Sequence, residues 1–158
     1  MPKYAQQTEV TSDRSRSEIE RTLQRYGASK FAYGWSEGYA VVQFEMRDRR
    51  IKFKLPLPDE NDPDIITTPA GRARSNQQAI HVYEQAKRQR WRALLLSIKA
   101  KLESVEAGIE EFEEAFLAQI ILPDGRTVSE MTRPGIELAY TTGQMPHFPL
   151  LEGPRVKP

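Results

Sequence analysis

The sequence predicts an α+β fold, and three observations carry this prediction. A short helical pattern near the N-terminus is followed by three strand patterns that alternate apolar and polar residues. A long run of apolar residues spaced three and four apart, typical of a helix, comes next. The chain has 158 residues, 39% of them hydrophobic, which fits one domain with a single core.

The N-terminal region divides into an arm and a helix. Residues 1–12 show no hydrophobic periodicity, so we expect a flexible arm there and a single domain over residues 13–145. The helix after the arm is predicted because Ile19 and Leu23 fall on one stripe, and Gly27 is a typical stop. A helix this short needs a surface on which to pack.

Residues 30–57 carry the strand signal. Apolar residues occupy every second position in three short segments that are separated by two polar turns, which predicts a three-stranded antiparallel meander with one apolar face. Pro56 and Pro58 end the third strand and indicate that it lies at an edge of the sheet. The apolar residues of the second and third strands are Ala40, Val42, Phe44, Met46, Ile51, Phe53, Leu55 and Leu57.

A loop and a long helix follow the meander. Residues 59–75 are rich in Asp, Pro, Thr and Gly, so we expect a mobile loop without regular structure. The helix is predicted to start at Ser75 or Asn76. If it continued to residue 118 it would be about 65 Å long, so we expect it to bend, with Gly108 as the bend. Its apolar stripe exceeds what one small sheet covers, which favours a homodimer through this helix.

The C-terminal region is predicted to be a small strand, turn and helix. A Pro-Asp-Gly turn at residues 123–125 connects two short extended segments. Thr127 and Glu130 have the spacing of a capping box, and Thr132 is a rival helix start. The helix should stop at Gly143. Residues 146–158 are predicted to form an extended, proline-rich tail.

The net charge of +1 hides strongly charged blocks. Residues 72–101 hold eight basic residues and one acidic residue, whereas residues 102–116 hold six glutamates and no base. A basic block of this size can attract a polyanion even when the whole chain is nearly neutral. The alternative is that the basic and acidic blocks pair with each other, within one chain or between subunits.

Two groups of cations are candidate contacts to nucleic-acid phosphates. The first lies in the long helix, where we expect a polar face away from the apolar stripe. The second alternates with apolar residues along the third strand. The alternatives are a solubilising helix face and a lysine-protected edge strand. The candidates are Lys87, Arg88, Arg90, Arg92 and Lys99 in the helix, and Arg50, Lys52 and Lys54 in the strand.

Three rings near these cations are candidate stacking groups for bases. They are Tyr33, Trp35 and Tyr39. If the outer face of the sheet shows these rings beside the strand cations, single strands are plausible ligands, because every base can stack on an aromatic face. The alternative is that Tyr33 and Trp35 belong to the core.

The sequence does not indicate an enzyme. His81 and His147 lie far apart in the chain and in no motif, and no glycine-rich phosphate loop is found. The acidic group at residues 59–64 lacks the spacing and the glycine of an EF-hand. The absence of cysteine excludes disulfides and thiolate metal sites. We therefore expect no catalytic residues, no metal and no cofactor.

The start of the chain is polar, and no apolar run is long enough to cross a bilayer. We therefore expect no membrane association and a cytoplasmic location.

The segments RTLQRYGASKFAYGW, FKLPLPD, QRWRALLLSIKAKLESVEAG and LPDGRTV resemble a family of small proteins from bacteriophages, prophages and mobile elements. The resemblance brings no motif of assigned chemistry. It implies a protein that works in a bacterial host cell near phage replication or recombination. Together with the charge pattern, this predicts a non-enzymatic accessory protein that binds nucleic acid, with single-stranded DNA favoured. The alternative is a protein-interaction module, an inhibitor or adaptor of a host complex, that uses the glutamate run and the proline-rich tail.

Overall fold

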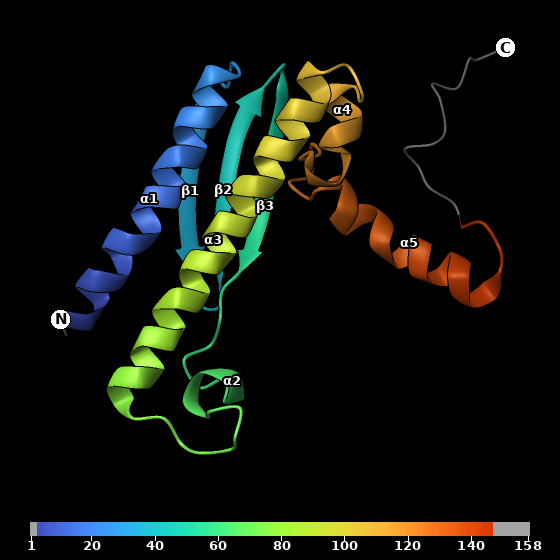
Figure 1. Cartoon of the computed structure of the whole chain (residues 1–158). Helices are drawn as coiled ribbons and strands as arrows, with labels where there is room; N and C mark the ends of the chain where they lie inside the picture. Colours follow the sequence, from blue (N-terminus) through green and yellow to red (C-terminus); the bar gives the residue numbers. More distant parts are fainter. Residues whose placement is uncertain (1–2, 147–158) are drawn as a thin grey trace, which may run out of the picture.

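The computed structural model describes the backbone of residues 3–146 and the side chains from Asp13 onward. Two helices, α1 and α3, lie across one face of a three-stranded sheet, which is the predicted α+β fold (Figure 1). The elements in chain order are α1 (Lys3–Arg25), β1 (Lys30–Ser36), β2 (Tyr39–Met46), β3 (Arg49–Pro56), α2 (Pro63–Ile66), α3 (Asn76–Glu106), α4 (Phe112–Ala115), the 3-10 helix η1 (Leu117–Gln119) and α5 (Val128–Thr142).

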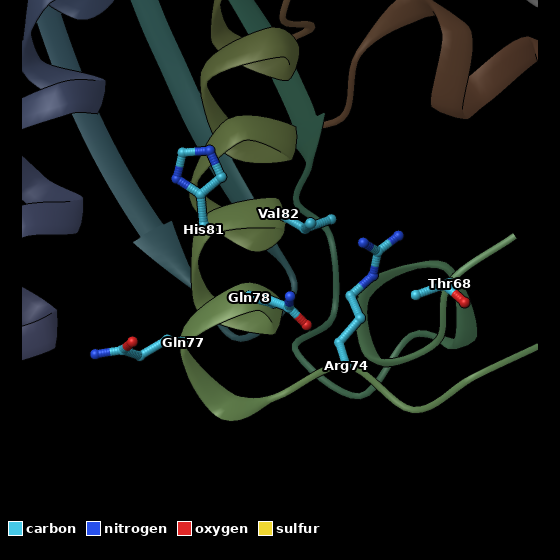
Figure 2. A pocket seen from close by; sticks show the side chains of 6 residues that line it. All are labelled: Thr68, Arg74, Gln77, Gln78, His81 and Val82. Atoms are coloured by element: carbon cyan, nitrogen blue, oxygen red, sulfur yellow. The ribbon is translucent and has the colours of Figure 1, made fainter.

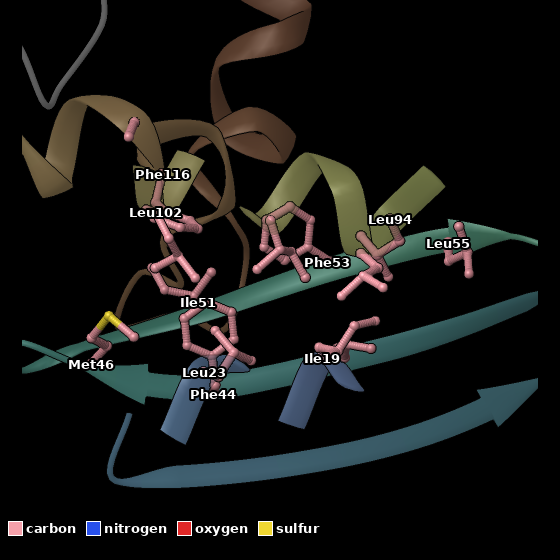
Figure 3. Close-up of a cluster of buried hydrophobic side chains, with 14 of the residues drawn as sticks. Ile19, Leu23, Phe44, Met46, Ile51, Phe53, Leu55, Leu94, Leu102 and Phe116 are labelled. Atoms are coloured by element: carbon pink, nitrogen blue, oxygen red, sulfur yellow. The ribbon is translucent and has the colours of Figure 1, made fainter. Parts of the chain in front are cut away.

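The sheet is the predicted antiparallel meander, with strand order β1-β2-β3. Its register aligns Tyr33 with Val42 and Val42 with Phe53, so apolar residues of all three strands share the face covered by the helices. The predicted apolar residues of β2 are all buried. Figure 3 shows the resulting core, in which side chains from α1 and α3 meet those of β2 and β3.

Helix α1 is longer than expected. We predicted a flexible arm over residues 1–12, whereas α1 already begins at Lys3 and continues to Arg25. The sequence between these two residues holds no proline and no glycine, so nothing in the chain interrupts the helix once it has formed. The predicted stop is confirmed, because Gly27 has a φ of +97°.

The segment between β3 and α3 has regular structure, so the prediction of a loop without it is wrong. Pro63 opens α2, where its missing N–H costs nothing, and Ile65 is buried. The Arg74 N–H donates to the Ile66 carbonyl at 2.8 Å, which ties the two ends of the segment together. Proline breaks a helix in its interior, but at the first position it favours the helix, and Pro63 occupies that position.

Helix α3 starts where the sequence predicted and ends earlier than expected. Ser75 and Gln78 form a capping box. Gly108, with a φ of +72°, ends the helix instead of bending it, because the Ile109 N–H donates to the Ser104 carbonyl at 2.9 Å and closes a Schellman motif. The helix therefore has 31 residues and is about 46 Å long.

The apolar stripe of α3 is buried within one chain. Its five central members lie under α1 and against the sheet, and none of them is exposed. These five side chains therefore offer no apolar surface to a second copy, and a dimer through α3 stays a prediction. These members are Trp91, Leu94, Leu95, Ile98 and Leu102.

The C-terminal region contains isolated bridges instead of strands. Ile121 pairs with Thr127 across the predicted Pro-Asp-Gly turn, and the Ile121 N–H donates to the Arg50 carbonyl at 2.8 Å, so the turn covers part of the outer edge of β3. Thr127 and Glu130 form the predicted capping box of α5, so the rival start at Thr132 is wrong. Helix α5 ends at Gly143, as predicted. The predicted tail lies outside the described residues from residue 147 onward.

The turn between β2 and β3 is unusual. Arg47 and Asp48 have φ values of +49° and +59°, a conformation that is costly for side chains other than glycine. The Arg47 guanidinium lies 5.5 Å from the centre of the Phe112 ring, so the tip of this hairpin contacts α4.

Candidate nucleic-acid interface

The three cations of β3 lie on the face of the sheet that points away from α1 and α3. Ile51, Phe53 and Leu55 are buried in the core, and in a strand the residues between them point to the opposite face. We call this opposite side the open face. Its residues are Lys30, Ala32, Gly34 and Ser36 of β1, Tyr39, Val41, Gln43 and Glu45 of β2, and Arg50, Lys52 and Lys54 of β3.

The open face is basic and largely exposed. It carries four cations and one carboxylate. Helices α1 and α3 both cross the other side of the sheet, and the start of α5 reaches this face at Lys52, whose side chain is 20% exposed (Figure 1). An antiparallel sheet with one open face is stable because the other face holds the core.

One side of the open face is nearly flat. Strand β1 contributes only small side chains there between Lys30 and the end of the strand, and nothing lies within 4 Å of where a side chain on Gly34 would start. Beside this floor stands the Tyr39 ring, with the Lys54 ammonium 4.3 Å from its centre. A ring beside a shallow floor and a row of cations is the arrangement that single-stranded nucleic acid needs.

Two ion pairs lie at the margins of the open face. Lys30 meets Glu45 at 2.8 Å, and Lys52 meets Glu130 at 3.5 Å. The Thr127 backbone N–H and the Lys52 ammonium lower the pKa of Glu130. The Lys30 side chain is 73% exposed, and an exposed pair contributes about 0–1 kcal/mol, so a phosphate can replace the Glu45 carboxylate at little cost, whereas Lys52 is 20% exposed.

The cations of α3 do not form one polar face, contrary to expectation. The 100° step of a helix puts Arg88, Arg92 and Lys99 on one flank of the buried stripe and Arg90 on the other. Lys101 shares the flank of Arg90, and its ammonium donates to the Ala115 carbonyl at 2.6 Å. Of the remaining candidates in this helix, Lys87 lies with its ammonium 5.5 Å from the Tyr83 ring centre.

The flank with Arg88 faces α1 and forms a second basic surface, which we call the helical seam. Lys99 bonds to Glu18 of α1 at 2.6 Å, which places the two helices side by side there. On α1, Arg14, Arg21 and Arg25 fall on the same side as Glu18. The helical seam consists of Arg14, Glu18, Arg21 and Arg25 of α1 and Arg88, Arg92, Lys99, Glu103 and Glu106 of α3.

The charges of the helical seam make its one salt bridge sensitive to pH. The Lys99 hydrogen bond and charge, with Arg21 and Arg92, lower the pKa of Glu18 below its ordinary value of 4.5. Glu18 therefore contributes stability above its unfolded-state pKa, and that contribution is lost as the pH falls through its folded-state pKa.

We expect the melting temperature of the native protein to fall more steeply with acid than that of Glu18→Gln, measured by circular dichroism from about pH 6 to about pH 3. Parallel curves for the two proteins would contradict this coupling.

The three candidate rings do not share a face. Tyr33 packs on Trp91 at 5.4 Å between ring centres, and the Arg16 guanidinium lies 4.2 Å above it, so Tyr33 is part of the core margin. Trp35 lies on the same side of the sheet and is 72% exposed at the end of β1. Only Tyr39 lies on the open face. Lys30 was not among the residues predicted from the sequence. It alternates with the apolar Phe31, and this alternation could have placed Lys30 on the open face.

The two basic surfaces are separated by the sheet and by acidic ends. The open face and the helical seam point away from each other, with the core between them. The C-terminal part of α3 and α4, which carry the glutamate run, lie at one end of the molecule, and α2 lies at the other (Figure 1). The acidic segment before α2 lies close to Tyr83. Burial, then Glu60 and Asp59, raise the pKa of Tyr83.

A hollow of about 340 Å³ lies between α3 and the segment after α2 (Figure 2). In Figure 2 the Arg74 guanidinium points toward Val82 and Thr68, whereas His81 points away on the far side of α3. The hollow therefore does not bring the imidazole and the Thr68 hydroxyl together as a base and a nucleophile. Its lining residues are Thr68, Arg74, Gln77, Gln78, His81 and Val82.

Comparison of the chain with protein-family models, with curated proteins and with solved structures finds no match. Among the helices of the described residues, none has the length and apolar character needed to span a bilayer. The functional proposal therefore depends on the two basic surfaces and on the chemistry that they offer.

Proposed function

We propose that this protein is a non-enzymatic accessory protein of phage or mobile-element type that binds single-stranded DNA on the open face of its sheet. The observation that carries the proposal is the position of Arg50, Lys52 and Lys54 in one row on the open face, beside Tyr39. A host cytoplasm is the location that this proposal implies.

The cations supply the affinity. Arg50, Lys52 and Lys54 alternate along β3, so their Cα atoms lie about 7 Å apart, and their long side chains can reach successive phosphates of an extended strand. Each phosphate that they neutralise releases counterions, which makes binding strong at low salt and weak at high salt. Lys30 adds a fourth charge across the sheet.

The floor of the open face favours a single strand over a duplex. Bases of a single strand are unstacked and can lie on Ala32 and Gly34 or stack on Tyr39, whereas a duplex hides the faces of its bases. Stacking contributes about 1–3 kcal/mol per base. A duplex would keep only the phosphate contacts and should bind less tightly.

The test is fluorescence anisotropy with a labelled single-stranded oligonucleotide, titrated with salt. Arg50→Glu/Lys54→Glu is compared with Arg126→Glu/Arg133→Glu, which changes the net charge equally on exposed residues of the C-terminal region. We expect the open-face variant to lose at least about tenfold in affinity and to show a shallower salt slope, because it neutralises fewer phosphates. The control variant should stay within about threefold.

Two results would count against the proposal. Equal losses in the two variants would mean that only the net charge matters. Absence of binding by the native protein at low salt would remove nucleic acid as the ligand. A labelled duplex of the same length serves as the comparison, and tighter binding of the duplex would contradict the preference for single strands.

A second candidate function is a protein-interaction module, and helix α5 is the observation that favours it. Ile136, Leu138 and Tyr140 are 47%, 53% and 89% exposed, more than apolar side chains on one short helix usually are. A photo-crosslinking residue at position 140 would trap a host protein if α5 binds one. Crosslinking that disappears in Ile136→Ser/Leu138→Ser would support this function.

A further inference from the structure

We propose that the helical seam is a second, separate binding surface for a nucleic-acid backbone, so that one molecule holds two strands at once. This inference depends on the proposed function, because it assigns the open face to the first strand. It assigns to the protein the further activity of bridging strands that do not pair with each other.

The helical seam holds more cations than the open face. It carries six cations against three glutamates. Glu18 is bound by Lys99, and Glu103 accepts a hydrogen bond from the Tyr26 hydroxyl at 3.2 Å, so two of the three carboxylates are already engaged. Five of the cations are arginines with exposed side chains, and the guanidinium group can hold a phosphate with two parallel hydrogen bonds.

The helical seam is also long enough to follow a backbone. Arg14 and Arg25 are about 16 Å apart along the axis of α1, and Arg88 and Lys99 are about as far apart along α3. The Lys99–Glu18 and Tyr26–Glu103 contacts show that the two helices run parallel, with Lys99 level with Glu18, so the basic row of α3 overlaps that of α1 near Lys99 and α1 continues it. A strand that lies along the seam would therefore pass from the guanidinium groups of α3 to those of α1.

The two surfaces are unlike the two halves of one continuous groove. The sheet and the layer of helices separate them by roughly 10 Å of packed core. A single strand that passed from one surface to the other around an end of the molecule would cross either the acidic segment at residues 59–64 or the glutamates at residues 110–114, and both repel phosphates. Two strands avoid this cost.

Native mass spectrometry with the native protein and a short oligothymidylate tests the proposal directly. Such an oligonucleotide does not pair with itself, so any complex with two copies must be held together by protein. We expect a complex of one chain with two oligonucleotides at excess ligand. Arg21→Glu/Arg92→Glu, which reverses two charges of the seam, should shift the population to one oligonucleotide per chain and lower the affinity of the second site at least about tenfold.

A capture assay gives the second readout. One oligothymidylate is fixed to beads and binds the protein. The assay then measures how much of a second, labelled oligothymidylate the bead-bound protein retains from solution. The seam variant should still bind the beads, through the open face, but should retain less than about a tenth of the label. The control Arg126→Glu/Arg133→Glu should behave as the native protein, and all variants are first shown to be folded by circular dichroism.

The outcomes separate this inference from the function on which it depends. Binding of one oligonucleotide per chain at every ligand concentration would overturn bridging and leave the open face as the binding site. Mass spectra that show only complexes of two chains with two oligonucleotides would assign bridging to a dimer. That result would also overturn the proposal that one chain holds two strands. Absence of any bound oligonucleotide would overturn the proposed function itself.

Discussion

Replacing Trp91 with alanine is expected to lower the free energy of unfolding by about 3–5 kcal/mol. The side chain is 1% exposed and lies where α3 crosses the sheet, with the Tyr33 ring 5.4 Å away. Its loss leaves a cavity that neither the sheet nor α1 can close, because Leu95 and Ile98, one and two turns further along α3, hold the helix in the same core. The loss is a large share of the roughly 5–15 kcal/mol that stabilises a typical domain.

Urea unfolding followed by far-UV circular dichroism measures this effect. Leu96→Ala is the matched control, because Leu96 lies on the same helix and is 52% exposed, and it should change the free energy by less than about 0.5 kcal/mol. Trp91→Phe keeps most of the volume and remains measurable if the alanine variant does not fold. A loss under about 1 kcal/mol in Trp91→Ala would show that this part of the core is not packed as described.

Phe116→Ala is expected to have an effect of similar size, about 3–5 kcal/mol. Phe116 is fully buried at the centre of an aromatic cluster, with ring centres of Phe44, Phe53 and Phe112 between 4.9 and 6.2 Å away. Two of these contacts are edge-to-face, a favoured geometry for aromatic pairs. The ring also fastens α4 to the sheet, so its loss should loosen the region that leads to α5.

The two consequences of Phe116→Ala can be measured separately. Urea unfolding reports the global loss, and amide hydrogen exchange reports faster opening of residues 112–130 than of β2. Leu117→Ala, a change at the neighbouring exposed residue, is the control and should affect neither quantity. Unchanged exchange in the C-terminal region of Phe116→Ala would mean that other contacts hold α4 in place.

The sheet and the starts of the later helices could be predicted from the sequence, because their signals are local. Apolar residues at every second position in residues 39–55 determine which side chains face the core. Each capping box, at Ser75 and at Thr127, involves only the cap residue and the residue three positions later. The prediction of a bend at Gly108 is wrong because the packing of later residues decides whether a glycine ends or bends a helix. Here Phe112 and Phe116 return to the sheet, and the helix cannot continue.

The candidate site was only partly predictable for the same reason. The alternation along β3 placed Arg50, Lys52 and Lys54 together, which the register bears out. The split of the α3 cations follows from the 100° step and the apolar stripe, but which flank faces α1 does not, and the Glu18–Lys99 contact joins residues 81 positions apart. No local pattern reports such a contact, so the helical seam could not be assembled from the sequence.

The Arg47–Asp48 turn has a consequence for the order in which the chain folds. Both residues hold positive φ values without a glycine to ease them, so the hairpin of β2 and β3 begins from an unfavourable turn. The contacts between β2 and β3 are local in sequence, but the cost of the turn makes the hairpin depend on partners distant in the chain, among them Trp91 and Phe116. The long helix α3 can form early through its own hydrogen bonds, and the strands can then pack on it. Folding should therefore start from a helix, although the sheet is at the centre of the folded protein.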